Sequence, residues 1–269
     1  MNLTIGSRGG GSRTAPTFST DRLMPVYFIQ SQFIQNDRIV LTGDLAHHLR
    51  DVLRCRPGEI VSLVDEKQVQ YRAALDQVNK KQVVAKILCK DESPGRPARS
   101  VTLVQAVLKG KKMDWVIQKA TELGVTTLIP VITERTIVRP KSEREFHQTE
   151  RWQAIAQEAA QQCGRVDIPS IQSTVTLDAL LKNPPENSFK LALWETEQRL
   201  SLKSALRNMK ERTSISVLIG PEGGFSSREI EKARETGWAS VSLGPRILRA
   251  ETAGTAVLAI LEYELNETR

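Results

Sequence analysis

The sequence predicts an α/β protein in which a small β-barrel precedes a larger domain built on a parallel sheet. Before residue 90, short β-branched segments are bounded by turn residues, which is typical of a barrel of roughly 65 residues. After residue 100, strands alternate with helices, which indicates a parallel sheet covered on both faces. Between them, residues 90–100 (KDESPGRPARS) are charged, contain two prolines and lack apolar periodicity. The expected domains are a flexible extension (1–23), the barrel (24–92), a linker (93–100) and the α/β domain (101–269).

The barrel is expected to contain five strands and one helix. The strands are expected at residues 26–30, 38–43, 59–65, 69–78 and 80–90. The helix is expected at residues 43–54, with Asp44 as its N-cap. One face of this helix is apolar apart from His48, so we predict that His48 packs in the core rather than binding a ligand. That face consists of Leu45, His48, Leu49, Val52 and Leu53.

The α/β domain is expected to begin with a strand and to end with a helix. Strands are expected at residues 100–108, 125–133, 189–195, 214–220 and 239–244, and helices at 111–124, 142–164 and 252–265. Gly164 supplies the stop of the second helix. The last helix is apolar nearly all round, so we expect it in a core or an interface.

The chain of 269 residues is basic, with a net charge of +7 and a pI of about 9.4. A basic protein commonly binds nucleic acid, although solubility alone also explains such a charge. No apolar run approaches the roughly 20 residues that span a bilayer, so we expect no membrane contact. The three cysteines are widely spaced and odd in number, which favours a reducing cytoplasm. The three histidines form no ligand pattern with them, so we expect no metal site.

Residues 216–234 (SVLIGPEGGFSSREIEKAR) predict a buried strand, a glycine-rich turn and a helix. The turn lacks the lysine of a Walker loop and does not match the G-x-G-x-x-G pattern of a dinucleotide site. Glu222 stands where an anion would bind, and Ser226 and Glu229 have capping-box spacing, so the helix satisfies its own first amides. We therefore expect a neutral or cationic ligand at this strand end.

A second strand ends in the same way within residues 241–261 (VSLGPRILRAETAGTAVLAIL). Gly244 follows Gly220 by 24 residues, and two such turns place two loops on the same rim of the sheet. Together, IGPEGGFSSREI and LGPRILRAETA resemble the SPOUT-class RNA methyltransferases, and are similar in particular to the bacterial enzymes that methylate N3 of a uridine in 16S ribosomal RNA. The similarity covers residues 25–265 and includes QAVLKGKKMDWVIQKATELGV, PVITERTIVRP, RWQAIAQEAAQQCGRVDIP and, in the barrel, HHLRDVLRCRPGEIVSLVD.

The resemblance implies a trefoil knot near these two loops, a homodimer with the pocket close to its two-fold axis, and a PUA-like barrel that binds RNA. It also implies S-adenosylmethionine as cofactor, whose sulfonium cation suits an acidic turn without lysine. Three loops would form the pocket. The cofactor-binding residues implied are Leu193, Trp194, Glu195, Ile219, Gly220, Pro221, Glu222, Gly223, Leu243, Gly244, Ile247, Leu248 and Ala253.

For the chemistry, we expect Arg249 to stabilise the uracil anion that forms when N3 loses its proton. Glu251 is expected to hold Arg249 or to take a proton. The alternative for both is an ordinary ion pair at a helix start.

RNA contacts are expected first at Lys109, Lys111 and Lys112, which stand at a helix N-terminus. The helix dipole disfavours cations there, and RNA phosphates would compensate it. Glu158 and Gln162 on the long helix, with Arg165 beyond it, are expected to line the substrate side of the pocket. The remaining expected RNA contacts are Arg50, Arg54 and Arg56 in the barrel, and Arg135 and Arg139 after a strand.

The expected partner is 16S ribosomal RNA, within the small ribosomal subunit. Two alternatives stay open: a methyltransferase for another RNA such as tRNA, and a non-catalytic RNA-binding assembly factor. The second alternative would not need both cofactor loops.

Overall fold

The computed structural model describes residues 25–92, 100–138, 142–186, 188–207, 209 and 214–265. The expected extension (1–23), residues 93–99 of the linker and Arg139 lie outside the described residues. Among the described helices, none is long and apolar enough to cross a membrane.

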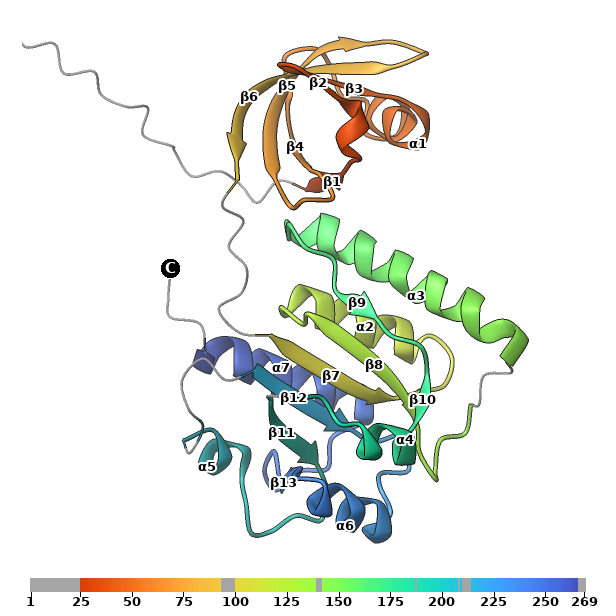
Figure 1. Cartoon of the computed structure of the whole chain (residues 1–269), viewed down its shortest axis with the longest axis vertical. Coiled ribbons are helices and arrows are strands. Elements are labelled where there is room, and N and C mark those ends of the chain that lie inside the picture. Colours follow the sequence, from red (N-terminus) through yellow and green to blue (C-terminus); the bar gives the residue numbers. More distant parts are fainter. Residues whose placement is uncertain are drawn as a thin grey trace, which may run out of the picture.

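The first domain is a curled six-stranded sheet, visible above the rest of the molecule in Figure 1. Its strands are β1 (Val26–Phe28), β2 (Ile34–Gln35), β3 (Arg38–Leu41), β4 (Ile60–Val64), β5 (Gln70–Val78) and β6 (Val83–Asp91), in the order β1-β4-β5-β6-β3-β2. β1 pairs with β4 in parallel and the other pairs are antiparallel. Burial alternates along the first six residues of β5, so every second side chain of this strand enters the core of the sheet. This core includes Ile39, Leu63 and Ala73.

The helix of this domain differs from the sequence-based prediction. It is an α-helical turn, α1 (Gly43–His47), followed by a π-helical segment, η2 (His48–Val52), in which the Leu53 N–H donates to the His48 carbonyl at 2.9 Å. Thr42 is the N-cap and Asp44 lies in the first turn, so the cap assignment to Asp44 was wrong.

The π-helical turn is wider than an α-helical one, and it rotates Val52 and Leu53 away from the predicted face. Val52 and Leu53 are 59% and 45% exposed, while Leu49 stays fully buried. His48 is exposed as well, with its ring centroid 6.1 Å from that of Tyr27, so the prediction of a core histidine was wrong.

The second domain is built on a parallel sheet in the order β10-β8-β7-β12-β11-β13, with β9 paired to β8. The strands are β7 (Val101–Ala106), β8 (Thr127–Ile132), β9 (Ser170–Ile171), β10 (Val175–Thr176), β11 (Ser188–Leu193), β12 (Ser214–Ile219) and β13 (Ala239–Val241). Because they all run parallel, the carboxyl ends of β11, β12 and β13 lie on one edge of the sheet.

Helices cover both faces of this sheet, as the alternation predicted. One core contains apolar side chains of α2 (Lys112–Glu122), α3 (Ser142–Cys163), α5 (Leu202–Arg207) and α7 (Ala250–Leu265). The other contains those of α4 (Leu177–Lys182) and α6 (Ser227–Glu235). α3 also contacts β1, so it lies between the two domains (Figure 1).

Candidate active site

A cavity of about 250 Å³ lies at the carboxyl ends of β11, β12 and β13. All the residues predicted to bind the cofactor line it, so the three loops inferred from the sequence meet at one place. Six further lining residues were not singled out: Gly224, Phe225, Val241, Ser242, Arg246 and Ala250. Each of them lies within a few positions of a predicted residue, so their closeness in sequence to the two motifs could have identified them.

The GPEGG turn needs its glycines for specific steric reasons. Gly224 has φ +67°, a left-handed conformation that side chains rarely adopt. A Cβ on Gly220 would lie 3.2 Å from the Phe225 ring, and Phe225 is buried beneath the turn. The Gly223 carbonyl accepts a hydrogen bond from Arg135 Nη1 at 2.8 Å, which ties the loop after β8 to this turn.

The capping box predicted at the start of α6 is present. Ser226 Oγ accepts from the Glu229 N–H, and Glu229 Oε2 accepts from the Ser226 N–H at 2.9 Å. Glu229 is only 8% exposed, and its other oxygen accepts from the Glu134 N–H at 2.8 Å. The same carboxylate therefore caps α6 and anchors the loop after β8 beside the pocket.

Glu222 lines the pocket, but its carboxylate is turned toward the start of α2. It accepts from the Lys109 N–H at 3.1 Å and lies 3.6 Å from Lys112 Nζ. Burial works against ionisation of Glu222, but the amide donors and the Lys112 ammonium outweigh it and hold its pKa below the usual value.

Glu251 forms an ion pair with Lys112, whose Nζ is 3.3 Å from Glu251 Oε1. The expectation that Glu251 holds Arg249 was therefore wrong. α7 begins at Ala250, and two positions along a helix are separated by about 200° around its axis, so the two side chains point in different directions. Arg249 is exposed next to the first turn of α7, and Arg246 lines the pocket in its place.

Trp194 is supported by an ion pair between an exposed arginine, Arg234, and a buried carboxylate, Glu197. The Arg234 guanidinium lies 5.4 Å from the centroid of the Trp194 ring, and Arg234 Nη2 donates to Glu197 at 2.8 Å. Glu197 also accepts from Ser240 and from the Arg199 N–H. This network fixes one wall of the pocket through residues that do not line it.

Glu195 places its carboxylate against the backbone of the GPEGG turn. A Cβ on Gly224 would lie 2.2 Å from Glu195 Oε1, so the glycine makes room for this carboxylate. Glu222 and Glu251 are paired with Lys112, whereas Glu195 has no ion pair among the described residues. Glu195 is thus the acidic group most available to a ligand in the pocket.

The predicted RNA contacts of the second domain lie in different places. Lys109 and Lys111 are exposed at the start of α2. Arg165 lies at the opposite edge of the sheet, where Nη1 donates to the carbonyls of Thr121 and Val125 at 2.7 and 2.9 Å. The prediction that Arg165 lines the substrate side of the pocket was therefore wrong. Glu158 and Gln162 are exposed on α3, and neither lines the pocket.

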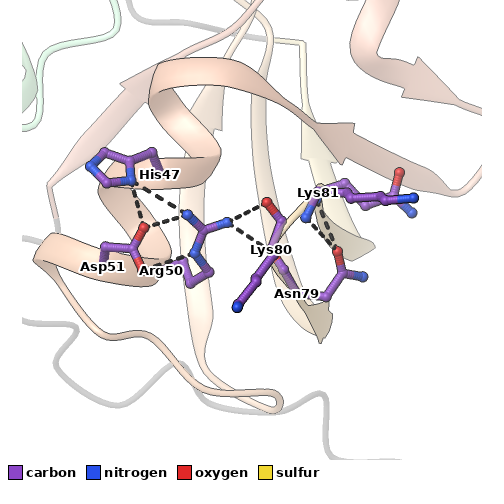
Figure 2. Close-up of polar contacts among 7 residues, drawn as sticks. His47, Arg50, Asp51, Asn79, Lys80 and Lys81 are labelled. Carbon is purple, nitrogen blue, oxygen red and sulfur yellow. Dashed lines mark hydrogen bonds and ion pairs between the residues drawn. The ribbon is translucent and has the colours of Figure 1, made fainter.

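In the barrel, Arg50 braces a hairpin rather than extending into solvent. Figure 2 shows its guanidinium reaching from the helix to the turn between β5 and β6, where Nη1 donates to the carbonyls of Asn79 and Lys80 at 3.1 and 2.7 Å. Its hydrogen bonds to Asp51 lower the pKa of that carboxyl to about 2. Arg54 and Arg56, which follow the helix, are exposed.

Comparison with known families defines the class of protein. A model described as an RNA methyltransferase domain matches residues 95–262, and one described as an RNA methyltransferase PUA domain matches residues 41–88. The chain thus has the domains of an RNA methyltransferase with an N-terminal PUA domain.

Relatives narrow this further. Proteins named ribosomal RNA small subunit methyltransferase E are 32% identical in Aquifex aeolicus (88% of this chain, 99% of the relative) and 29% identical in Bacillus subtilis (90% and 97%). The chain therefore belongs to the ribosomal RNA small subunit methyltransferase E family, and the resemblance drawn from its two loop motifs is confirmed.

Solved structures agree with this assignment. The protein of that name from Neisseria gonorrhoeae, bound to S-adenosylmethionine, has a TM-score of 0.78 at 32% identity and covers 90% of this chain and 98% of its own. A methyltransferase from Legionella pneumophila, in complex with the same cofactor, has a TM-score of 0.78 at 31% identity, with the same coverage. The knot that the resemblance implies stays a prediction.

Proposed function

We propose that this protein transfers the methyl group of S-adenosylmethionine to N3 of a uridine in 16S ribosomal RNA. One observation carries the proposal: three loops far apart in the sequence converge on a single pocket at the carboxyl edge of the sheet. The names and cofactor complexes of the relatives support it.

The pocket suits the proposed cofactor in shape and charge. Leu193, Ile219 and Leu248 offer apolar surface for an adenine ring, and the glycine turns expose backbone donors and acceptors. The carboxylate of Glu195, which forms no ion pair with the described residues, matches a ligand that carries a cationic sulfonium and amino group. When bound, the cofactor supplies an electrophilic methyl group on sulfur.

The chemistry requires that uracil N3 lose its proton and bond to the methyl carbon, while the methyl–sulfur bond breaks and its electron pair stays on sulfur. Arg249 is exposed at the start of α7, free to lie beside the uracil carbonyls and stabilise the anion. The N-terminus of α7 favours negative charge in the same place. Glu251, in the first turn of this helix, is the proposed acceptor of the N3 proton.

The substrate is proposed to be bound from both domains. The exposed basic residues Lys109 and Lys111 near the pocket, and Arg54 and Arg56 in the PUA domain, would contact phosphates. We further propose that the protein acts on the small ribosomal subunit in the cytoplasm as a homodimer. Tyr263 and Ile260 on α7 are 84% and 38% exposed and would contribute to the dimer contact.

Two measurements test the proposal. Calorimetric titration with S-adenosylmethionine should show binding, and a folded protein that binds none would exclude the enzyme. Mapping of modified nucleosides in a deletion strain should show loss of one N3-methyluridine from 16S ribosomal RNA. Loss from tRNA would redirect the proposal, and unchanged RNA with a defect in subunit assembly would favour a binding factor.

Arg249→Ala provides a direct test of the chemistry. We expect turnover to fall by about 100-fold or more, with the affinity for S-adenosylmethionine changed by less than about threefold. Arg228→Ala, which removes an exposed arginine from α6, is the matched control and should leave both unchanged. Full turnover by the Arg249→Ala variant would remove this residue from the mechanism.

A further inference from the structure

We propose that Lys112 is a positioning residue for methyl transfer, and that it acts by holding two carboxylates of the pocket loops, those of Glu222 and Glu251, in one arrangement. This inference rests on the proposed methyltransferase function. It differs from the sequence-based expectation, in which Lys112 was one of three lysines that contact RNA phosphates.

The geometry joins three separate parts of the chain at one ammonium group. Lys112 is the first residue of α2, and its Nζ lies 3.3 Å from Glu251 Oε1 and 3.6 Å from Glu222 Oε1. Glu222 belongs to the GPEGG turn and lines the pocket. Glu251 follows Ala250, which also lines the pocket, in the first turn of α7. One cation thus connects the second and third loops of the site.

The charges explain why a cation is needed between these loops. The side chains of Glu222 and Glu251 are only 24% and 15% exposed, so water screens their mutual repulsion poorly. Glu222 has a second donor in the Lys109 N–H, but the ion pair of Glu251 is with Lys112. Removal of the ammonium should therefore affect the position of Glu251 more than that of Glu222.

Glu251 carries a second sign of a functional role. Its Oε2 atom is buried and accepts no hydrogen bond from the described residues. A buried carboxylate oxygen without a donor is unfavourable, and such groups in native proteins call for an explanation. A donor supplied by the bound substrate satisfies it, and Lys112 leaves this oxygen free because it engages only Oε1.

The test replaces Lys112 by Met, which keeps the length of the side chain and removes its charge. We expect kcat to fall by about tenfold or more, while the Kd for S-adenosylmethionine and the KM for the RNA substrate change by less than about threefold. Lys112→Arg, which keeps the charge, should recover most of the rate. Lys119→Met removes the same charge from the same helix, where the ion pair with Glu122 is local, and should leave all three constants unchanged.

A double-mutant cycle separates positioning from a general loss of structure. If Lys112 acts through Glu251, Lys112→Met should lower kcat by less than about threefold in a Glu251→Gln background. Equal losses in both backgrounds would overturn the proposal. The proposal would also be overturned if Lys112→Met kept its kcat but had a higher and less salt-sensitive KM for RNA, because a residue that contacts phosphate behaves in that way.

Binding of S-adenosylmethionine shows that a variant is folded. If Lys112→Met does not fold, Lys112→Gln serves as a second variant without the charge.

The proposed function and the proposed role of Lys112 fail in different ways. If the wild-type protein neither binds the cofactor nor methylates small-subunit RNA, the proposed function fails. If it does both and the cycle is additive, only the role of Lys112 is refuted.

Discussion

Replacing Glu197 by Gln tests the ion pair between Glu197 and Arg234 that supports Trp194. The carboxylate is 5% exposed and accepts hydrogen bonds from Arg234, from Ser240 and from the Arg199 N–H. Burial opposes its ionisation, but these donors outweigh burial and lower the pKa of Glu197 to about 2. Glutamine keeps the shape and an acceptor oxygen, so the substitution isolates the contribution of the charge.

The magnitude follows from the two pKa values of Glu197. A change from 4.5 in the unfolded chain to about 2 in the folded protein contributes about 3 kcal/mol of stability at neutral pH. Because the folded value is the lower one, this contribution is complete above about pH 4.5 and is lost as the pH falls toward about 2. Roughly 2 kcal/mol of it should disappear between about pH 5 and about pH 3.

The assay is urea denaturation of the wild-type protein and of Glu197→Gln across this pH range. The difference between their free energies of unfolding should shrink by about 2 kcal/mol from about pH 5 to about pH 3. Glu231→Gln is the control: Glu231 pairs with the same Arg234, at 3.5 Å, but is 67% exposed and should change stability by less than about 0.5 kcal/mol. A difference between wild type and Glu197→Gln that does not vary with pH would refute the reasoning.

Two further predictions concern the GPEGG turn and its helix. Gly224→Ala should lower stability by about 1–2 kcal/mol because of its left-handed backbone, and Gly237→Ala, at φ +86° in open space, should lower it by a similar amount. Only Gly224→Ala should also weaken S-adenosylmethionine binding, by about tenfold, because its Cβ displaces the Glu195 carboxylate. Equal affinities of the two variants for the cofactor would argue against a role for Glu195 in binding it. Glu229→Ala should lower the free energy of unfolding by about 2 kcal/mol, since the part-buried N–H groups of Glu134 and Ser226 lose their acceptor, whereas Glu231→Ala should stay within about 0.5 kcal/mol of wild type in the same denaturation assay.

The pocket was predictable because parallel strands share an edge. Once Gly220 and Gly244 were assigned to strand ends, their loops had to lie on the same rim, and the motif resemblance supplied the third loop. The capping box of Ser226 and Glu229 was predictable for a different reason: it depends only on residues three positions apart.

Features that depend on distant partners were not predictable. Trp194 was assigned to the pocket, but its support by Arg234 and Glu197 requires knowing that α6 packs beside the end of β11. In the barrel, the π-helical segment, with its i to i+5 hydrogen bond from the Leu53 N–H to the His48 carbonyl, leaves Val52 and Leu53 of the predicted apolar face exposed. Local periodicity assumes 3.6 residues per turn, so it carries no signal of a π-helical segment.

The lysines at the start of α2 show how a correct observation led to an incomplete inference. Cations at a helix N-terminus oppose the dipole, so some negative charge must compensate them. Phosphates of a bound RNA and carboxylates of the protein itself satisfy this requirement equally well. The carboxylates are Glu222 and Glu251, more than a hundred positions after Lys112. Only the folded chain reveals that Lys112 is compensated from within, which leaves Lys109 and Lys111 as the exposed cations that an RNA would meet. The three lysines lie within four consecutive positions but should therefore differ in function, with Lys112 affecting the rate of methyl transfer, and Lys109 and Lys111 the affinity for RNA.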